Sequence, residues 1–379
     1  MVRIAHLSDT HLGYKQYNLD EREQDVYDVF EEIAGRILEE KVDIILHCGD
    51  LFDSWRPTTQ AYYAFKKFLD KVEGKAKVFS ILGDHDTPKK RGMPPQKLFD
   101  DRITILGLNR GDYKTLKIDG KEVLIAGISN LRRRYKEVLI EEMKKLDSIA
   151  TKYEYTVLAL HQGIDKYLPF KEAYELRLEE IPKNFKYYAM GHLHSRIRAS
   201  HGIGELAYSG STEIFNKGEI SSYEKLGKGF YIVDLEDDEV KIENVDLEKI
   251  RPQLYQRIKY QNFAAELDHL THSLGEYKKN PIVHVRVEGK QIDRQMVYEA
   301  LEEALASRTL RFRPEIVEAT ENKLVEIEPG SFNIRQVLRE YLKDEQISGL
   351  AYELFSLLKT GETAEAKNIA DEYLRSQIS

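Results

Sequence analysis

Five short fragments of this chain combine acidic and imidazole side chains, and each fragment follows an apolar run. The fragments are Asp9-Thr10-His11, Gly49-Asp50, Gly83-Asp84-His85-Asp86, His161-Gln162-Gly163 and Gly191-His192-Leu193-His194. A single Asp-x-His would indicate little, because this pattern is common on protein surfaces. Five fragments in this order predict a binuclear metal centre, whose expected ligands are Asp9, His11, Asp50, Asp84, His161, His192 and His194.

The mixture of carboxylates and imidazoles restricts the metal. Mn²⁺, Fe²⁺ and Zn²⁺ accept both kinds of ligand, whereas cages for Ca²⁺ or Mg²⁺ are built almost wholly from oxygen. No thiolate occurs in the fragments, which disfavours a structural zinc site. Two metals roughly 4 Å apart can hold a phosphate ester, activate a water molecule and stabilise an in-line displacement.

Each ligand can be given a role. An aspartate between two metals can bridge them, and Asp50 is the natural candidate because it closely follows an apolar strand. One metal would be completed by Asp9, His11 and His194, and the other by Asp84, His161 and His192. His85 is next to the ligand Asp84 but belongs to neither ligand set. This position suits a general acid or a hydrogen-bond donor to the transition-state oxygens.

Strands and helices alternate over the first two-thirds of the chain. Apolar runs at 42–47 and 78–82 are typical of strands that are covered on both faces. Further strands are predicted at 2–7, 155–160 and 187–190, each directly before a ligand fragment. A helix is predicted over 20–40 from its 3.6-residue apolar period, and Asp20 with Glu23 resembles a capping box. The pattern predicts an α/β sandwich with helices outside.

The pattern changes twice toward the C-terminus. After residues 1–247, residues 248–320 read helix, strand, helix, strand, which predicts a smaller α+β capping domain. Residues 321–330 resemble a linker, and residues 331–379 read as helices that form a hairpin. The apolar stripes of these helices could bind a partner helix or dock on the chain itself, and the pattern favours neither. The candidate partner-binding residues are Ile334, Val337, Leu338, Tyr341, Leu350, Leu354 and Phe355.

Composition sets further limits. The chain has 379 residues, of which 41% are hydrophobic and 32% charged, so several globular domains are expected. No apolar stretch approaches the roughly 20 residues of a membrane span, and no signal peptide is visible. The single cysteine, Cys48, fits a reducing cytoplasm. A net charge of −8 argues against sequence-independent coating of DNA, but bound divalent cations could still receive a phosphate.

At the five fragments the chain resembles the calcineurin-like metallophosphoesterases, which adopt an αββα sandwich. Their pattern of Asp-x-His, Gly-Asp, Gly-Asn-His-Asp/Glu, His and Gly-His-x-His is matched at every fragment except for one residue. Further residues are similar to the archaeal Mre-eleven nucleases, the SbcD-type subunits of DNA double-strand-break repair complexes. These are 12–14, 51–52 with 56–57, 161–163, 187–189 and 208–211.

This resemblance implies a DNA nuclease with two Mn²⁺ per chain, or alternatively Mg²⁺, Fe²⁺ or Zn²⁺. It implies 3′-to-5′ exonuclease and endonuclease activity on single-stranded and duplex DNA ends, in the nucleoid-associated cytoplasm. It also implies a homodimer, for which the helix at 20–40 is a candidate contact. The expected partner is an SMC-like ABC ATPase of the SbcC type, and the C-terminal helices would bind the root of its coiled coil.

Two residues depart from the family pattern. Asp84 stands where the family has Asn, so it adds negative charge beside the phosphate and removes an amide donor. We expect metal binding to survive and activity to fall. Asp53 stands where some relatives have a histidine that supports exonuclease action, and a carboxylate cannot donate a hydrogen bond in its place.

Candidate DNA contacts follow the first and third fragments, since their loops leave the ligand strands within a few residues. They are Tyr14, Lys15, Tyr17, Lys89, Lys90 and Arg91. Tyrosine rings that stack on bases, together with lysine charges near the phosphates, could hold a frayed DNA strand. Two other functions stay open: a phosphatase or phosphodiesterase for small substrates, and a largely non-catalytic subunit that tethers DNA ends.

Overall fold

The structure is a computed structural model that describes residues 1–89, 92–168, 173–237, 239–318, 334–360, 365–367, 369–370 and 373. The chain divides into two compact units. Met1–Leu168 with Glu172–Asn322 form the first, and Pro169–Lys171 with Lys323–Ser379 form the second. Lys90, Arg91 and the expected linker at 321–330 lie outside the described residues.

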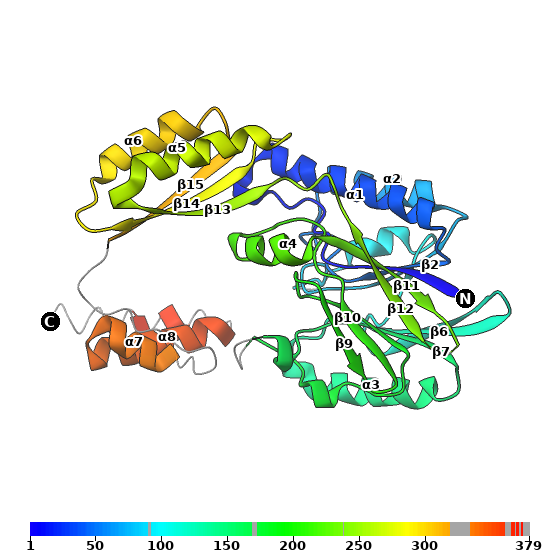
Figure 1. The fold of residues 1–379 in the computed structure, drawn as a ribbon. Coiled ribbons are helices and arrows are strands. Elements are labelled where there is room, and N and C mark those ends of the chain that lie inside the picture. The colour runs from blue at the N-terminus through cyan, green and yellow to red at the C-terminus, as the bar shows by residue number, and fades with distance from the viewer. Residues whose placement is uncertain are drawn as a thin grey trace. The chain divides into compact units, whose positions relative to one another are not determined.

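Two six-stranded sheets form the sandwich domain of the first unit (Figure 1). The first has the order β12-β11-β1-β2-β3-β4 and the second β5-β6-β7-β8-β10-β9. The first contains β1 (Val2–Leu7), β2 (Ile44–Cys48), β3 (Lys77–Ile81), β4 (Thr104–Ile105), β11 (Gly229–Leu235) and β12 (Val240–Asp246). The second contains β5 (Asp112–Ile118), β6 (Lys121–Ile128), β7 (Tyr155–His161), β8 (Tyr187–Gly191), β9 (Ile197–His201) and β10 (Gly204–Tyr208).

The ligand-bearing strands run parallel within each sheet. β1, β2 and β3 pair in parallel, as do β6, β7 and β8. Every residue of β2, β7 and β8 is buried, which explains why these strands are apolar runs without alternation. Because parallel strands end at the same edge of a sheet, the loops after β1, β2 and β3 emerge together.

The core has three layers, which confirms the expected αββα sandwich. One apolar cluster lies between the sheets and includes Leu46, Ile81 and Val157. A second packs the outer face of the first sheet against α1 (Asp20–Glu40) and α2 (Thr59–Val72). A third packs the outer face of the second sheet against α3 (Lys136–Ala150).

The helix starts differ in how they are capped. Asp20 is the first residue of α1 and its carboxylate pairs with Lys15, while Leu19 occupies the N-cap position without a side-chain bond. The expected capping box is therefore wrong, because Asp20 lies one position inside the helix. At α2, Thr58 Oγ1 accepts a hydrogen bond from the Ala61 N–H at 3.2 Å.

A three-stranded sheet of order β13-β14-β15 and two helices form the capping domain. Its elements are β13 (Gln253–Lys259), α5 (Phe263–Ser273), β14 (Ile282–Gly289), α6 (Arg294–Leu305) and β15 (Arg311–Glu318). Four of these were expected, and β13 was not. Both helices lie on one face of the sheet over a core of its own (Figure 1).

The second unit contains α7 (Ile334–Leu342) and α8 (Glu345–Thr360). Asp344 Oδ1 accepts hydrogen bonds from the N–H groups of Gln346 and Ile347 at the start of α8. Ser348 Oγ donates to the carbonyl of Leu338 at 3.2 Å, which ties the two helices into a hairpin. Among the described residues, no helix is long and apolar enough to cross a membrane.

The remaining helical segments are short. α4 (Ile220–Leu226) lies beside the sandwich, and several 3₁₀ turns connect the larger elements. These turns are Gln16–Asn18, Pro95–Phe99, Arg133–Tyr135, Asp165–Tyr167, Leu178–Glu180, Lys217–Glu219, Tyr260–Asn262 and Leu274–Glu276.

Candidate metal centre

The loops after five strands meet at one end of the sandwich domain and carry the seven expected ligands. These come from β1 (Asp9, His11), β2 (Asp50), β3 (Asp84), β7 (His161) and β8 (His192, His194). Their donor atoms form overlapping groups in which all atoms lie within 4.8 Å of one another. The strand ends thus bring together residues that are far apart in the sequence.

Asp9, His11 and His194 form the first group. His11 Nε2 lies 3.3 Å from His194 Nε2, and His194 Nε2 lies 3.9 Å from Asp9 Oδ1. Asp9 is fully buried and also accepts hydrogen bonds from Ser8 Oγ and the His192 N–H. Two imidazole nitrogens facing each other at this distance leave space for a shared cation.

Asp84, His161 and His192 form the second group. Asp84 Oδ1 lies 3.3 Å from His161 Nε2 and 3.4 Å from His192 Nδ1. The Nδ1 atom of His161 donates to the carbonyl of Cys48 at 2.7 Å, which directs its Nε2 toward Asp84.

Asp50 lies between the two groups. Its Oδ2 atom is 3.8 Å from His11 Nε2 and 3.4 Å from His161 Nε2. Its Oδ1 atom accepts a hydrogen bond from the His85 N–H at 2.9 Å. A single carboxylate therefore faces one imidazole of each group, which is the geometry expected of a bridging ligand.

The donor set fits a pair of divalent cations. Among the described residues, the carboxylates of Asp9 and Asp50 contact histidine rings, backbone N–H groups and the Ser8 hydroxyl. None of these partners is a lysine or an arginine. Burial lowers the pKa of His11, but Asp53, Asp50 and Asp9 outweigh it and raise this pKa to about 9. Such an excess of buried negative charge is what bound cations would neutralise.

Several of these residues have a strained backbone. The φ angle is 52° at Asp9, 44° at His11, 54° at Asp50 and 91° at His192. L-residues rarely adopt this left-handed region, and each such residue costs on the order of 1–3 kcal/mol. The fold tolerates this strain where the loops must turn their side chains toward one point.

The glycines of the fragments are required by close packing. A Cβ atom on Gly83 would lie 2.0 Å from Asp50 Oδ1, and one on Gly191 would lie 2.0 Å from the Cys48 carbonyl oxygen. Both distances are far below van der Waals contact, so the backbone must approach here without a side chain.

Asp86 is a site residue whose role the sequence analysis did not identify. Its buried carboxylate accepts hydrogen bonds from the N–H groups of Leu51, Phe52 and Gly83 at 3.0, 2.9 and 3.3 Å. Burial and the charge of Asp50 raise the pKa of Asp86 to about 6, although these three bonds lower it. Asp86 thereby ties the loop that carries Asp50 to the loop that carries Asp84.

Glu219 was also missed, because its distance in sequence from the fragments offers no signal. Its Oε1 atom accepts from His194 Nδ1 at 2.8 Å, and its Oε2 atom accepts from Lys228 Nζ at 2.5 Å. Burial raises the pKa of Glu219, but His194 and Lys228 lower it to about 2. The ionised carboxylate accepts the hydrogen bond from Nδ1 and thereby directs Nε2 of His194 toward Asp9 and His11.

His85 lies at the open side of the site, with 42% of its side chain exposed. Its Nδ1 atom donates to the backbone carbonyl of Asp53 at 2.7 Å, and its Nε2 atom is 3.9 Å from Asp84 Oδ2. The Asp53 carboxylate lies 3.5 Å from His11 Nδ1 and 3.6 Å from His85 Nδ1. His85 thus points its Nε2 toward the metal centre, and its donor atoms also lie within 4.8 Å of those of Asp50 with Asp84 and of His11 with Asp53.

The described DNA-contact candidates have different surroundings. Tyr14 packs edge-on to Phe215 and donates its hydroxyl to the Phe215 carbonyl at 2.9 Å, and Lys15 pairs with Asp20. Tyr17 faces the capping domain, where Arg313 lies over its ring at 4.8 Å. Lys89 is exposed near the third fragment.

Comparison with known proteins agrees with this architecture. The model of the calcineurin-like phosphoesterase family matches residues 2–196. The chain is 36% identical to the DNA double-strand break repair protein Mre11 of Thermoplasma acidophilum, over 93% of each chain. It is 33% identical to the protein of the same name from Methanocaldococcus jannaschii over 100% of each chain. For that of Saccharolobus solfataricus the identity is 33%, over 99% of this chain and 98% of the relative.

These matches extend over 93% to 100% of this chain and over 93% to 100% of the three relatives. The chain therefore belongs to the calcineurin-like phosphoesterase family and, within it, to the archaeal Mre11 proteins.

Proposed function

We propose that this protein is a Mn²⁺-dependent DNA nuclease that acts in double-strand-break repair, with exonuclease and endonuclease activity. One observation carries the proposal: Asp50 faces an imidazole of each of two ligand groups, which is the arrangement that a site for two cations would need. The names of the relatives support DNA as the substrate. Mg²⁺, Fe²⁺ and Zn²⁺ remain alternatives, since this ligand set accepts more than one metal.

The residues would divide the work as follows. Asp9, His11 and His194 would hold one metal, Asp84, His161 and His192 the other, and Asp50 both. Bound divalent cations would polarise the scissile phosphate and lower the pKa of a water molecule. His85 would donate a proton to the leaving oxygen from its Nε2. Asp86 and Glu219 would keep the ligand loops and the His194 ring in place.

The Asp84→Asn variant tests this function. Asn keeps a ligand oxygen but removes one negative charge beside the phosphate and adds an amide donor. We expect Mn²⁺-dependent cleavage of single-stranded and duplex DNA to rise about tenfold at unchanged metal content, a change of roughly 1.4 kcal/mol in the barrier. The measurement compares DNA cleavage with hydrolysis of a small chromogenic phosphodiester and counts bound metal in both proteins.

The Asp84→Ala variant is the matched control, because it removes the ligand oxygen as well as the charge and should lose metal. Hydrolysis of the small ester without DNA cleavage by either the parent chain or Asp84→Asn would replace the nuclease with a phosphodiesterase for small substrates. Retained metal with no hydrolysis of any ester would favour a largely non-catalytic subunit that tethers DNA ends. The negative charge of Asp84 beside the phosphate motivates this alternative.

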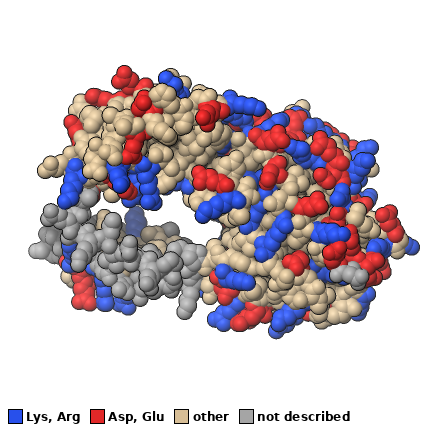
Figure 2. Space-filling model, in the orientation of Figure 1, with Lys and Arg blue, Asp and Glu red and all other residues tan. Residues whose placement is uncertain are grey.

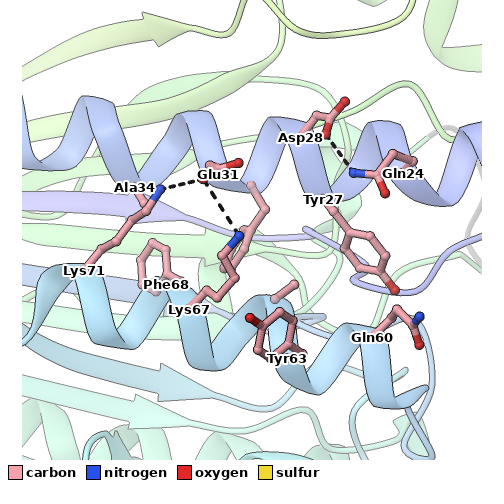
Figure 3. A pocket seen from close by; sticks show the side chains of 12 residues that line it. Gln24, Tyr27, Asp28, Glu31, Ala34, Gln60, Tyr63, Lys67, Phe68 and Lys71 are labelled. Carbon is pink, nitrogen blue, oxygen red and sulfur yellow. Dashed lines mark hydrogen bonds and ion pairs between the residues drawn. The ribbon is translucent and has the colours of Figure 1, made fainter.

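We further infer that the chain forms a homodimer through α1 and α2. A cavity of about 210 Å³ lies between these helices, with Tyr27, Phe30 and Phe68 among its lining residues (Figure 3). Tyr63 is 63% exposed at its rim. Glu31 pairs with Lys71 at 2.8 Å, so the same surface carries both signs of charge. A two-fold interface requires such self-complementarity, because each copy presents the same patch to the other.

The Tyr63→Glu variant tests the dimer. A charge at this exposed aromatic position should dissociate the dimer, and light scattering should then change from twice 44.1 kDa to 44.1 kDa. Tyr298→Glu is the control, because Tyr298 is 46% exposed on the capping domain. A parent chain that is monomeric at micromolar concentration, or a Tyr63→Glu protein that stays dimeric, would contradict this interface.

The helical unit supports the proposed ATPase partner. Tyr341 is 84% exposed, Leu358 56% and Phe355 40%, while Val337, Leu338, Ile334, Leu350 and Leu354 are partly buried in the hairpin. We infer that this surface binds the coiled-coil root of an SbcC-type SMC-like ABC ATPase, as an amphipathic helix pair binds a partner helix. Calorimetric titration of the full chain with such a coiled-coil fragment tests this, and absence of binding at micromolar concentration would refute it.

The remaining assignments follow from the same function. We infer that Tyr14, Lys15, Tyr17 and Lys89 approach the bound strand, together with Lys90 and Arg91 of the undescribed segment. We infer that a nuclease for chromosomal DNA acts in the nucleoid-associated cytoplasm. The domain scheme is nuclease at 1–247, capping domain at 248–320, linker at 321–330 and ATPase-binding helices at 331–379.

A further inference from the structure

A row of aromatic and basic side chains crosses the capping-domain sheet on the face opposite its helices. Tyr255, His284 and Arg313 are register neighbours on β13, β14 and β15. Because side chains alternate along a strand, the row two residues further on points to the same face. That row consists of Arg257, Arg286 and Glu315. Val283 and Val285, which flank His284 along β14, belong to the domain core with the helices.

This face forms one wall of a pocket, and the sandwich domain forms the other. The pocket has a volume of about 270 Å³ and is lined by Tyr17, Lys217, Tyr255, His284, Val285, Arg313, Pro314 and Glu315. The Arg313 guanidinium lies 4.8 Å from the centre of the Tyr17 ring, and Lys217 Nζ lies 5.6 Å from the centre of the Tyr255 ring. Lys and Arg side chains gather along this margin of the capping domain (Figure 2).

His284 is the most unusual residue of the pocket. It is only 5% exposed, and its Nε2 atom has no hydrogen-bond partner among the described residues. Burial, with the positive charges of Lys217 and Arg313, lowers the pKa of His284 to about 4. The imidazole is therefore neutral at neutral pH, and an orphaned polar atom in a buried position requires a partner.

The pocket adjoins the metal centre through one short segment. Phe215 packs against the His11 ring with 4.8 Å between ring centroids, and Lys217 follows two residues later. Glu219 in the same segment holds His194. Tyr17 is in turn six residues beyond His11. A strand whose phosphate lies at the metals would therefore pass close to this pocket.

We propose that this pocket binds a single unpaired nucleotide, with its base against Tyr17 and Tyr255, its edge at His284 Nε2, and its phosphate at Lys217 and Arg313. The proposal rests on the nuclease function, since the nucleotide would belong to the strand held at the metals. The pocket is small even for a small-ligand site, so it excludes a duplex. An unpaired base presents its face and its edge, whereas a paired base hides both in the stack. The charges also fit, because Arg286 pairs with Glu315 at 3.1 Å and still balances this carboxylate when Lys217, which now lies 3.0 Å from it, turns to the phosphate.

The test uses the full chain in EDTA, so that binding is measured without cleavage. Single-stranded oligonucleotides carry 2-aminopurine at successive positions, and its fluorescence falls when the base stacks on an aromatic ring. We expect quenching at one or two adjacent positions only. Tyr17→Ala and Arg313→Ala should abolish this quenching and weaken binding about tenfold, the effect of losing one stacked base. Tyr298→Ala and Arg308→Ala, matched in type and absent from the pocket lining, should change neither.

Three outcomes separate this proposal from the nuclease function. Uniform quenching at all positions, or variants that bind DNA like the parent chain, would overturn the proposed nucleotide pocket. In that case Mn²⁺-dependent DNA cleavage by the parent chain would still uphold the nuclease function. Absence of both DNA binding and cleavage would overturn both. If deoxyadenosine monophosphate binds with the same dependence on Tyr17 and Arg313 and oligonucleotides do not, the pocket holds a nucleotide that comes from solution rather than from the strand.

Discussion

Replacing Asp50 with alanine is expected to remove at least one metal equivalent per chain and to reduce phosphodiester hydrolysis by about 1000-fold or more, roughly 4 kcal/mol of lost stabilisation. The reason is that the Asp50 carboxylate faces both ligand groups, with His11 Nε2 at 3.8 Å and His161 Nε2 at 3.4 Å. Without it, two cations would repel each other across a site that has lost its central negative charge. Metal content after dialysis against Mn²⁺, together with hydrolysis of a small phosphodiester, measures both effects.

Asp50→Asn separates the charge of this residue from its shape. The amide oxygen can still accept a hydrogen bond from the His85 N–H, as Asp50 Oδ1 does at 2.9 Å. A neutral amide cannot balance the charge of two cations. We expect Asn to lose nearly as much metal as Ala. Two Mn²⁺ bound to the Asp50→Ala chain would refute the bridging role, and so would full activity of Asp50→Asn.

Replacing His85 with alanine should reduce DNA cleavage by about 100-fold or more while metal content stays unchanged. His85 donates from Nδ1 to the Asp53 carbonyl, so its Nε2 is the atom available for proton transfer. A deoxyribose alkoxide is a poor leaving group that needs this proton. A p-nitrophenolate leaves without one, so hydrolysis of bis(p-nitrophenyl) phosphate should fall much less.

The difference between the two substrates is the decisive result for His85. Equal losses on DNA and on the p-nitrophenyl ester would assign His85 to positioning or charge stabilisation instead of proton donation. A loss of metal in His85→Ala would make it a ligand. His272→Ala serves as the control, because its side chain is 78% exposed on the capping domain.

Much of the fold follows from local pattern. The runs that precede each fragment are apolar because β2, β7 and β8 are covered on both faces. The hairpin between β5 and β6 turns at Asp119-Gly120 with φ angles of 48° and 80°, and Asp-Gly is a residue pair that favours such positive φ values. The seven acid and imidazole donors are recognisable because each closely follows such a strand.

Other features could not be predicted because no local pattern encodes them. β13 has no strong apolar alternation of its own, and it becomes a strand by pairing in parallel with β14. Its register then places Tyr255 beside His284 and Arg313, which are distant in sequence. The expected capping box at α1 is wrong because the helix begins at Asp20 itself, so this carboxylate lies one position past the N-cap and pairs with Lys15.

The sequence by itself determined which side chains could do chemistry, because five apolar strands that each lead into Asp or His are typical of a metal centre. Only the tertiary structure decided how those side chains are held. Asp86 joins two loops through three backbone N–H groups, and Glu219 orients His194 from a segment with no motif. The Asp86 contacts join the loops after two neighbouring strands of one sheet, β2 and β3, whereas the Glu219 contact joins His194 to the segment between β10 and α4. Neither contact has a local signal, because buried polar groups must find their partners in three dimensions.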